Sequence, residues 1–306
     1  MRSISRYNNF CYFTIISVCL IIAAGGFVRM SGAGMGCPDW PKCFGKWIPP
    51  THVSQLPQNY KEIYSERGYD DLDYNLFNTW AEYINRLIGL VGGLFCFVLF
   101  VLSTKTKKPR LIFLSFLLLL LMAFQAWMGA LVVYSILAPF KITIHMLIAL
   151  IIISLLFFLY RSTSSSIEYK HEFVRFLIMG LFISVFQIIL GTQVREAVDA
   201  LSNLFNRDEI VSQLPLVFEI HRTTAWVVII SNIIIIYKHR FTFSNETEQL
   251  VIILTILALL FSGIIMSYFS VPGLAQFIHL LGAVAIFICQ LSMLLKRFNC
   301  SKLVFP

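Results

Sequence analysis

The sequence contains few charged residues for its length. Only 13% of its 306 residues are Asp, Glu, Lys or Arg, whereas a soluble domain of this size would carry about 25%. Hydrophobic residues make up 58% of the chain and include 28 phenylalanines. This composition excludes a soluble enzyme and predicts a polytopic membrane protein.

The sequence also lacks a nucleotide-binding motif, a low-complexity segment and a polar stretch long enough for a soluble domain. Its net charge of +8 would suit a nucleic-acid-binding protein, but the basic residues are spread over the short segments between apolar runs. Membrane topology explains that placement better. We therefore expect contact with membrane lipid and no binding of nucleic acid.

Eight apolar runs are long enough to cross a bilayer, which takes about 20 residues. They cover residues 10–30, 77–102, 111–134, 141–160, 173–194, 215–237, 248–268 and 273–295. An even number of spans places both termini on one side of the membrane. If that side is the cytoplasm, the inner segments hold 14 of the 24 Lys and Arg but only four of the 16 acidic residues. This follows the positive-inside rule and predicts cytoplasmic termini in a bacterial-type plasma membrane.

The first apolar run has a second interpretation as a cleaved signal peptide. Arg2 and Arg6 precede it, and Ala23-Ala24-Gly25 resembles a cleavage site. However, the run is longer than a signal sequence requires, and a motif at its end recurs later in the chain. We therefore interpret it as the first membrane helix.

Three features of the first half recur in the second half. The matching positions are Gly25 to Arg29 (Gly-x-x-Val-Arg) with Gly191 to Arg195, Asn85-Arg86 with His221-Arg222, and His145 with His279. Such parallel repeats often place a binding site within or between the two halves. The sequence thus predicts an all-α integral membrane protein whose eight transmembrane helices form two tandem four-helix bundles with the same orientation. The bundles would comprise residues 1–165 and 166–306.

The matching polar residues of the even-numbered runs share one depth in the membrane. Asn85, His145, His221 and His279 each lie about one to two helical turns below the outer surface, at 1.5 Å per residue. Two side chains at equal depth on two helices of one bundle can face each other across a flat ligand such as haem. We therefore expect the three histidines to bind haem iron. A hydrogen-bonded interior histidine is the alternative for each of them.

The longest polar segment is the first outer loop, at about residues 31–76, and it contains Cys37 and Cys43. Two cysteines six positions apart on the oxidising side of a membrane favour a disulfide that closes a small loop. Free thiols and a metal clip are the alternatives, although no neighbouring histidine completes a metal site.

Together these motifs resemble the haem A synthase family, membrane enzymes that convert haem O to haem A for cytochrome oxidase. The resemblance covers nearly the whole chain, and its most specific part is the loop Cys37-Pro38-Asp39-Trp40-Pro41-Lys42-Cys43. It also includes Glu82-x-x-x-Arg86 and Gln125-x-x-x-Gly129. By this resemblance, His221 and His279 are the axial ligands of a resident haem b, and the N-terminal half holds the substrate haem.

The chain departs from the family pattern at Asn85. Family members usually carry Glu-x-x-His in this helix, whose glutamate serves catalysis and whose histidine pairs with that of the fourth helix. Here the motif reads Glu82-Tyr83-Ile84-Asn85, so only His145 remains of the expected pair, and asparagine is a poor iron ligand. The resemblance then implies a five-coordinate substrate haem, a ligand supplied by the loop, or a divergent paralogue with altered activity.

Charged residues beside these positions each have two interpretations. Glu82 is a candidate catalytic residue that relays protons to the haem site, or it pairs structurally with Arg86. Arg86 and Arg222 bind haem propionates, or they extend to lipid phosphates.

The resemblance implies an oxidoreductase that uses haem b and oxidises the methyl group of haem O to the formyl group of haem A. An electron donor and the haem O-making farnesyltransferase are the expected partners, and a homo-oligomer remains open. The first rival function is a membrane haem-b electron-transfer protein without methyl oxidation. The second is a transporter built on parallel repeats, whose histidines handle protons or substrate.

Overall fold

The computed structural model describes residues 2–67, 73–134, 140–163, 171–202, 204–240 and 246–296. In this part of the chain the regular elements are helices, with no β-strand. Eight of the helices are long and apolar enough to cross a membrane. They are α1 (Arg2–Met30), α3 (Leu76–Thr104), α4 (Pro109–Tyr134), α5 (Lys141–Ser162), α6 (His171–Ser202), α8 (Leu216–Arg240), α9 (Glu246–Tyr268) and α10 (Gly273–Leu295). The predicted all-α integral membrane fold with eight transmembrane helices is confirmed.

Each long helix contains one of the predicted apolar runs, but several helices extend beyond it. The two largest differences are equal: α1 begins at Arg2 instead of residue 10, and α6 continues past Arg195 to Ser202 instead of ending at residue 194. The predicted apolar run stops near Arg195 because the charged residues Glu196 and Asp199 follow it. In the continued helix Glu196 accepts a hydrogen bond from the backbone N–H of Phe140, just before α5, and Asp199 accepts one from Arg29 of α1, so both charges have partners at this depth.

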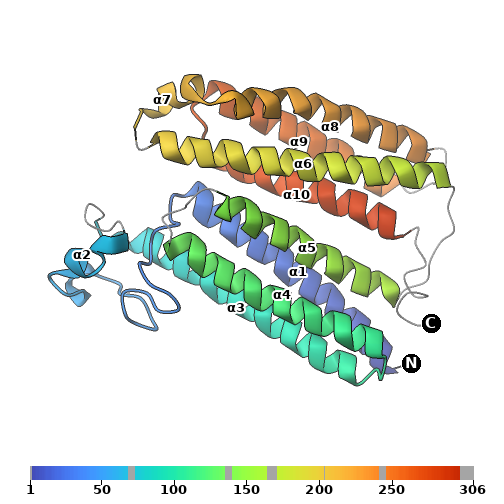
Figure 1. Cartoon of the computed structure of the whole chain (residues 1–306), viewed down its shortest axis with the longest axis horizontal. Coiled ribbons are helices and arrows are strands. Elements are labelled where there is room, and N and C mark those ends of the chain that lie inside the picture. Colours follow the sequence, from blue (N-terminus) through green and yellow to red (C-terminus); the bar gives the residue numbers. More distant parts are fainter. Residues whose placement is uncertain are drawn as a thin grey trace.

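The long helices lie in two groups of four (Figure 1). In one group α1, α3, α4 and α5 contact one another in that cyclic order, so α3 and α5 occupy opposite corners. In the other group α6, α8, α9 and α10 do the same, so α8 and α10 occupy opposite corners. That the two groups are repeats with one orientation stays a prediction, and the proposed boundary between residues 165 and 166 lies outside the described residues.

The two groups meet along α1, α5, α6 and α10. Fully buried leucines fill the first group, among them Leu99, Leu118 and Leu156, and Phe287 and Leu291 of α10 belong to the same apolar cluster. The start of α1 and the end of α10 lie at the same end of the molecule (Figure 1), as an even number of spans requires.

The first outer loop covers the opposite end of α3 (Figure 1). It contains the short helix α2 (Tyr60–Ile63) and two 3-10 turns, Val53–Gln55 and Ser65–Arg67. Phe44 lies at the centre of an aromatic cluster, and its ring meets Tyr60, Tyr64 and Tyr74 edge-on. This small core lets the loop hold a fixed shape against the helix end. The matching loop of the second group contains only α7 (Arg207–Ile210) and a 3-10 turn, Val211–Gln213.

Candidate functional site

His221 on α8 and His279 on α10 approach each other across the second group of helices. Their ring centres are 6.2 Å apart, and the ring planes are inclined by 60°. An imidazole nitrogen binds a metal at roughly 2 Å and lies ~1 Å from its ring centre, so two imidazoles on one iron have centres roughly 6 Å apart. The spacing of the two rings therefore fits axial ligation of a single iron.

The ring nitrogens of this pair also fit ligation. Nδ1 of His279 lies 3.2 Å from the carbonyl oxygen of Leu259 and 3.0 Å from the hydroxyl of Ser262. Since a carbonyl only accepts, Nδ1 carries the proton, which leaves the lone pair of Nε2 for a metal. Metal-binding histidines commonly donate their other N–H in this way. Nδ1 of His221 is buried without a hydrogen-bond partner, which is costly unless a bound group changes its surroundings.

A glycine on the neighbouring helix makes room for each candidate histidine. If each glycine carried a Cβ, that atom would lie within contact distance of the imidazole. The pairs are Gly191 with His221 at 3.2 Å, Gly263 with His279 at 3.6 Å and Gly129 with His145 at 3.6 Å. The contact at Gly191 would be tight even for alanine, whereas at Gly263 and Gly129 a Cβ would make ordinary van der Waals contact and only a larger side chain would displace the ring.

Two glutamines anchor the backbone of the same histidines. The Gln187 side chain donates to the carbonyl oxygen of His221 at 2.8 Å, and the Gln125 side chain donates to that of His145 at 3.0 Å. Each bond joins neighbouring helices at the level of the histidine. Both glutamines thereby hold the helix that carries a candidate histidine in place.

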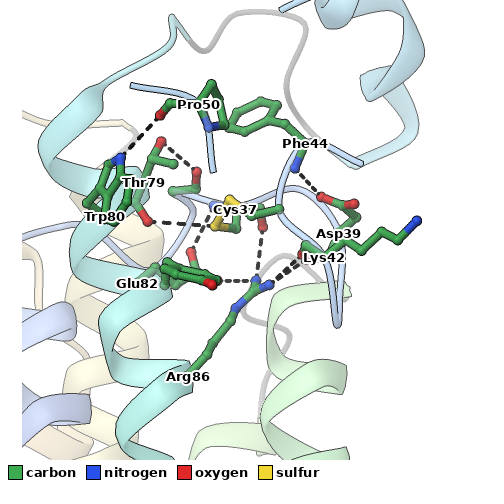
Figure 2. Close-up of a disulfide and its surroundings, with 12 residues drawn as sticks. Cys37, Asp39, Lys42, Phe44, Pro50, Thr79, Trp80, Glu82 and Arg86 are labelled. Carbon is green, nitrogen blue, oxygen red and sulfur yellow. Dashed lines mark hydrogen bonds and ion pairs between the residues drawn. A yellow bond between two sulfur atoms is a disulfide. The ribbon is translucent and has the colours of Figure 1, made fainter. Parts of the chain in front are cut away.

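In the first group, Glu82 is buried beneath the outer loop (Figure 2). Its side chain accepts a hydrogen bond from the backbone N–H of Cys37 at 3.0 Å and pairs with Arg86 at 2.5 Å. Both carboxylate oxygens thus have partners within the protein, and Glu82 is only 3% exposed. The structural pair with Arg86, which was the alternative interpretation of Glu82, is present.

Arg86 holds the cysteine loop against α3. It donates to the carbonyl oxygens of Asp39 and Lys42 at 2.7 and 2.8 Å and to that of Cys37 at 3.4 Å (Figure 2). With the bond to Glu82, both terminal nitrogens of the guanidinium are engaged. Propionate binding by Arg86 would therefore require one of these contacts to be exchanged.

The loop itself is closed by a disulfide between Cys37 and Cys43. Asp39 joins the disulfide-closed loop to the residues that follow it. Its carboxylate accepts hydrogen bonds from the backbone N–H groups of Phe44 at 2.6 Å and Gly45 at 2.8 Å. Burial raises the pKa of the nearby Tyr74 hydroxyl, which donates to the Pro50 carbonyl at 2.6 Å. The loop is therefore a pre-formed cap over Glu82.

Asn85 and His145 lie on helices at opposite corners of the first group. Asn85 is partly buried and lines a pocket of about 810 Å³ between α1 and α3. Nδ1 of His145 and the side-chain oxygen of Gln125 are buried and have no hydrogen-bond partner among the described residues. Around an ordinary interior histidine, the buried polar atoms would bond to one another. The two unpaired atoms here are instead what a site for a bound group would show.

Arg222 differs from its counterpart Arg86. It pairs with Glu219 at 2.6 Å and lies over the Phe218 ring, and its side chain remains 60% exposed. No backbone carbonyl of the described residues holds it in the way that the loop holds Arg86. The guanidinium is therefore accessible to an outer carboxylate or phosphate.

Comparison with known proteins shows which family the chain belongs to. The model of the cytochrome oxidase assembly protein family (COX15-CtaA) matches residues 8–291. The chain belongs to this family. It is 31% identical over 188 residues to the haem A synthase of Shewanella oneidensis, an alignment that covers 58% of this chain and 53% of that protein.

Further relatives carry the same name. The haem A synthase of Wolbachia sp. subsp. Brugia malayi is 27% identical over 195 residues, covering 58% of each chain. That of Pelagibacter ubique is 24% identical over 202 residues, covering 61% of this chain and 60% of the relative. The chain thus aligns with somewhat more than half the length of these relatives.

One polar cluster, where α1, α6 and α10 meet, was not predicted from the sequence. Asp199 on α6 accepts from Arg29 on α1 and from Arg195 at 2.8 Å, and Arg195 also donates to Gln276 on α10. The two matching arginines of the repeated motif therefore share one carboxylate at the junction of the two helix groups. The available signal was an acidic residue four positions after Arg195, one helical turn beyond the apolar run.

Proposed function

We propose that this chain is a haem A synthase, which oxidises the methyl group of haem O to the formyl group of haem A for cytochrome oxidase biogenesis. The observation that carries the proposal is the spacing of the His221 and His279 rings across the second helix group. Family membership and the names of the relatives support it. The same spacing is that of two ligands on one metal, which a transporter that only moves protons would not need.

In this proposal His221 and His279 would hold the iron of a resident haem b. The carbonyl of Leu259 sets the tautomer of His279, and Gln187 fixes the backbone of His221. Arg222 stands one residue from a ligand with an accessible guanidinium, so it is suited to pair with a propionate. Haem iron supplies the electron-transfer and oxidation chemistry that no side chain can provide.

The first helix group would bind the substrate haem O. His145 is the candidate iron ligand there, with Asn85 on the opposite helix. Arg86 acts on this site through the loop, because its guanidinium fixes the loop carbonyls above Glu82. The cap thereby excludes water from the outer side of the site.

Glu82 is the group that we propose to move protons at the substrate site. It is a carboxylate buried between the cap and the helix group, and the reaction releases protons from the substrate methyl group. Transfer would require Glu82 to release either Arg86 or the Cys37 N–H. Glu82→Gln removes the ionisable group but keeps only one of the two acceptor oxygens, so the reduction rate of the Cys37–Cys43 disulfide has to be measured in the same variant to separate proton transfer from loop anchoring.

The orientation and partners follow from the same proposal. The loop cap and the histidines would lie near the outer face of a bacterial-type plasma membrane, with both termini in the cytoplasm as the positive-inside rule requires. The oxidation needs an electron acceptor or donor, and the insoluble substrate favours transfer from the farnesyltransferase that makes haem O.

The decisive experiment is pigment analysis in a host that makes haem O but lacks its own haem A synthase. Expression of the chain should produce haem A or its alcohol intermediate in an acid extract. Glu82→Gln should lower conversion at unchanged haem b content, whereas Glu82→Ala should also weaken the cap. A protein that carries haem b but leaves haem O unchanged would contradict the proposal and favour the electron-transfer function.

A further inference from the structure

Three polar side chains form a buried network inside the second helix group. The Gln290 side chain on α10 donates a hydrogen bond to the side-chain oxygen of Asn232 on α8 at 3.0 Å and accepts one from the Ser184 hydroxyl on α6 at 2.9 Å. The Asn232 amide donates in turn to the Val228 carbonyl of its own helix at 2.9 Å. Gln290 and Asn232 are 0% exposed. The network therefore joins three of the four helices through bonds that are shielded from water.

The network repeats the placement of the candidate haem ligands. Asn232 follows His221 by eleven residues on α8, and Gln290 follows His279 by eleven residues on α10. Eleven residues make about three helical turns, so each amide lies on the same face of its helix as the histidine, about 16 Å further along. Since α8 and α10 occupy opposite corners of the group, the amide pair and the histidine pair span the same diagonal at two levels.

The first helix group has apolar side chains at the matching positions. The residues that the repeat aligns with Ser184, Asn232 and Gln290 are Val18, Cys96 and Leu156. All three are buried in the apolar cluster of the first group. The polar network of the second group thus has no counterpart at the aligned positions of the first group.

This difference changes what it costs to separate helices in a membrane. Lipid tails are as apolar as leucine, so lipid can replace the apolar contacts of Leu156. Lipid cannot replace the hydrogen bonds of Asn232 and Gln290, because hydrocarbon offers an amide no partner. The diagonal between α8 and α10 therefore resists separation more strongly than the diagonal between α3 and α5.

We propose that Ser184, Asn232 and Gln290 form a lock that keeps α8 and α10 together and thereby retains haem b. The first group lacks this lock, so α3 and α5 can separate to admit haem O and release haem A. The inference rests on the proposed function, because a synthase needs one resident haem and one that is exchanged at every turnover. The three residues act as positioning residues, since they hold the helices that carry the ligands from three turns away.

Transfer of haem to apomyoglobin measures this retention. The purified protein with haem b bound is mixed in detergent with excess apomyoglobin, and the absorption of the newly formed metmyoglobin gives the rate of haem loss. Each protein also carries His145→Ala, so that the haem followed is that of the second group. The double variant Asn232→Leu/Gln290→Leu replaces both amides with apolar side chains of similar size. We expect it to lose haem b about tenfold faster, because two interhelical hydrogen bonds are removed.

Two further variants separate retention from general stability. Ser231→Ala is the matched control, because Ser231 neighbours Asn232, is 9% exposed and bonds through its hydroxyl to a carbonyl of its own helix. It should lose haem b at the unchanged rate. Asn232→Leu alone leaves the Gln290 amide buried without this partner, so its thermal midpoint should be lower than that of the double variant. The lock predicts fast haem loss from both of them despite their different stabilities.

The outcomes distinguish the lock from the proposed function. A double variant that retains haem b as long as Ser231→Ala does would overturn the lock alone. Rates of haem loss that follow the thermal midpoints of the variants would assign the network to stability and would also overturn the lock. If the protein binds no haem that His221→Ala removes, the haem b site of the proposed function is wrong and the lock is wrong with it.

Discussion

Replacing Arg86 with methionine should loosen the cysteine loop far more than the matching replacement of Arg222. Both arginines follow a candidate site residue by one position, and both pair with a nearby glutamate. Only Arg86 is inserted beneath a loop, where it donates to three backbone carbonyls. Methionine keeps the apolar length of the side chain but removes every one of these donors.

The structure sets the expected size of the difference. The Arg86 and Glu82 side chains are 12% and 4% exposed, and removing one member of a buried pair costs about 3–5 kcal/mol. The Arg222 and Glu219 side chains are 60% and 50% exposed, and such pairs contribute about 0–1 kcal/mol. A difference of ~3 kcal/mol raises the population of the open loop roughly 100-fold.

Reduction of the disulfide measures this opening directly. Cys37 and Cys43 are both 0% exposed, so a water-soluble reductant reaches the bond only when the loop opens. The purified protein is exposed to the reductant for increasing times, newly formed thiols are labelled with a maleimide, and the label is counted by mass. At low reductant concentration the rate follows the open population.

We expect Arg86→Met to accelerate reduction about 100-fold and Arg222→Met to leave the rate within about threefold of the wild type. Arg86→Lys should lie between them, because lysine keeps the charge but lacks the planar fork. Equal rates in Arg86→Met and Arg222→Met would show that the loop is held by other contacts, and the assignment of Arg86 as its anchor would be wrong.

Two further predictions concern packing and the junction between the helix groups. A Cβ on Gly36 would collide with the backbone of α3, whereas one on Gly34 would meet nothing within 4 Å; Gly36→Ala should therefore cost at least about 1–3 kcal/mol and Gly34→Ala less than about 0.5 kcal/mol. Comparable thermal midpoints for these two variants would contradict the observed loop packing. Asp199→Ala leaves Arg29 and Arg195 without their shared acceptor and should cost about 1–3 kcal/mol, because the group is only partly exposed. An unchanged thermal midpoint would mean that the junction does not depend on this carboxylate.

The membrane spans and the candidate histidines could be predicted from the sequence because both depend on local pattern. Apolar runs of sufficient length have few alternatives to membrane helices. Repetition of Asn85-Arg86 as His221-Arg222, and of His145 as His279, identified the positions that the structure places at matching corners of the two groups. The close approach of His221 to His279 also follows from equal depth on two helices of one bundle.

Contacts between distant segments could not be predicted. Nothing local to Arg86 shows that it binds carbonyls more than 40 residues earlier in the chain, because the path of the outer loop has no regular periodicity. The same holds for Asp199, whose partner Arg29 lies on the first helix of the other group. The end of α6 was placed too early because polar residues can continue a membrane helix when neighbouring helices satisfy them.

The central claim is that His221 and His279 bind one haem b between them. Low-temperature EPR of the oxidised, purified protein tests it most directly. The wild type should show a low-spin haem with two imidazole ligands, which disappears in both His221→Ala and His279→Ala and persists in His145→Ala. Persistence of that signal in either His221→Ala or His279→Ala would contradict the claim.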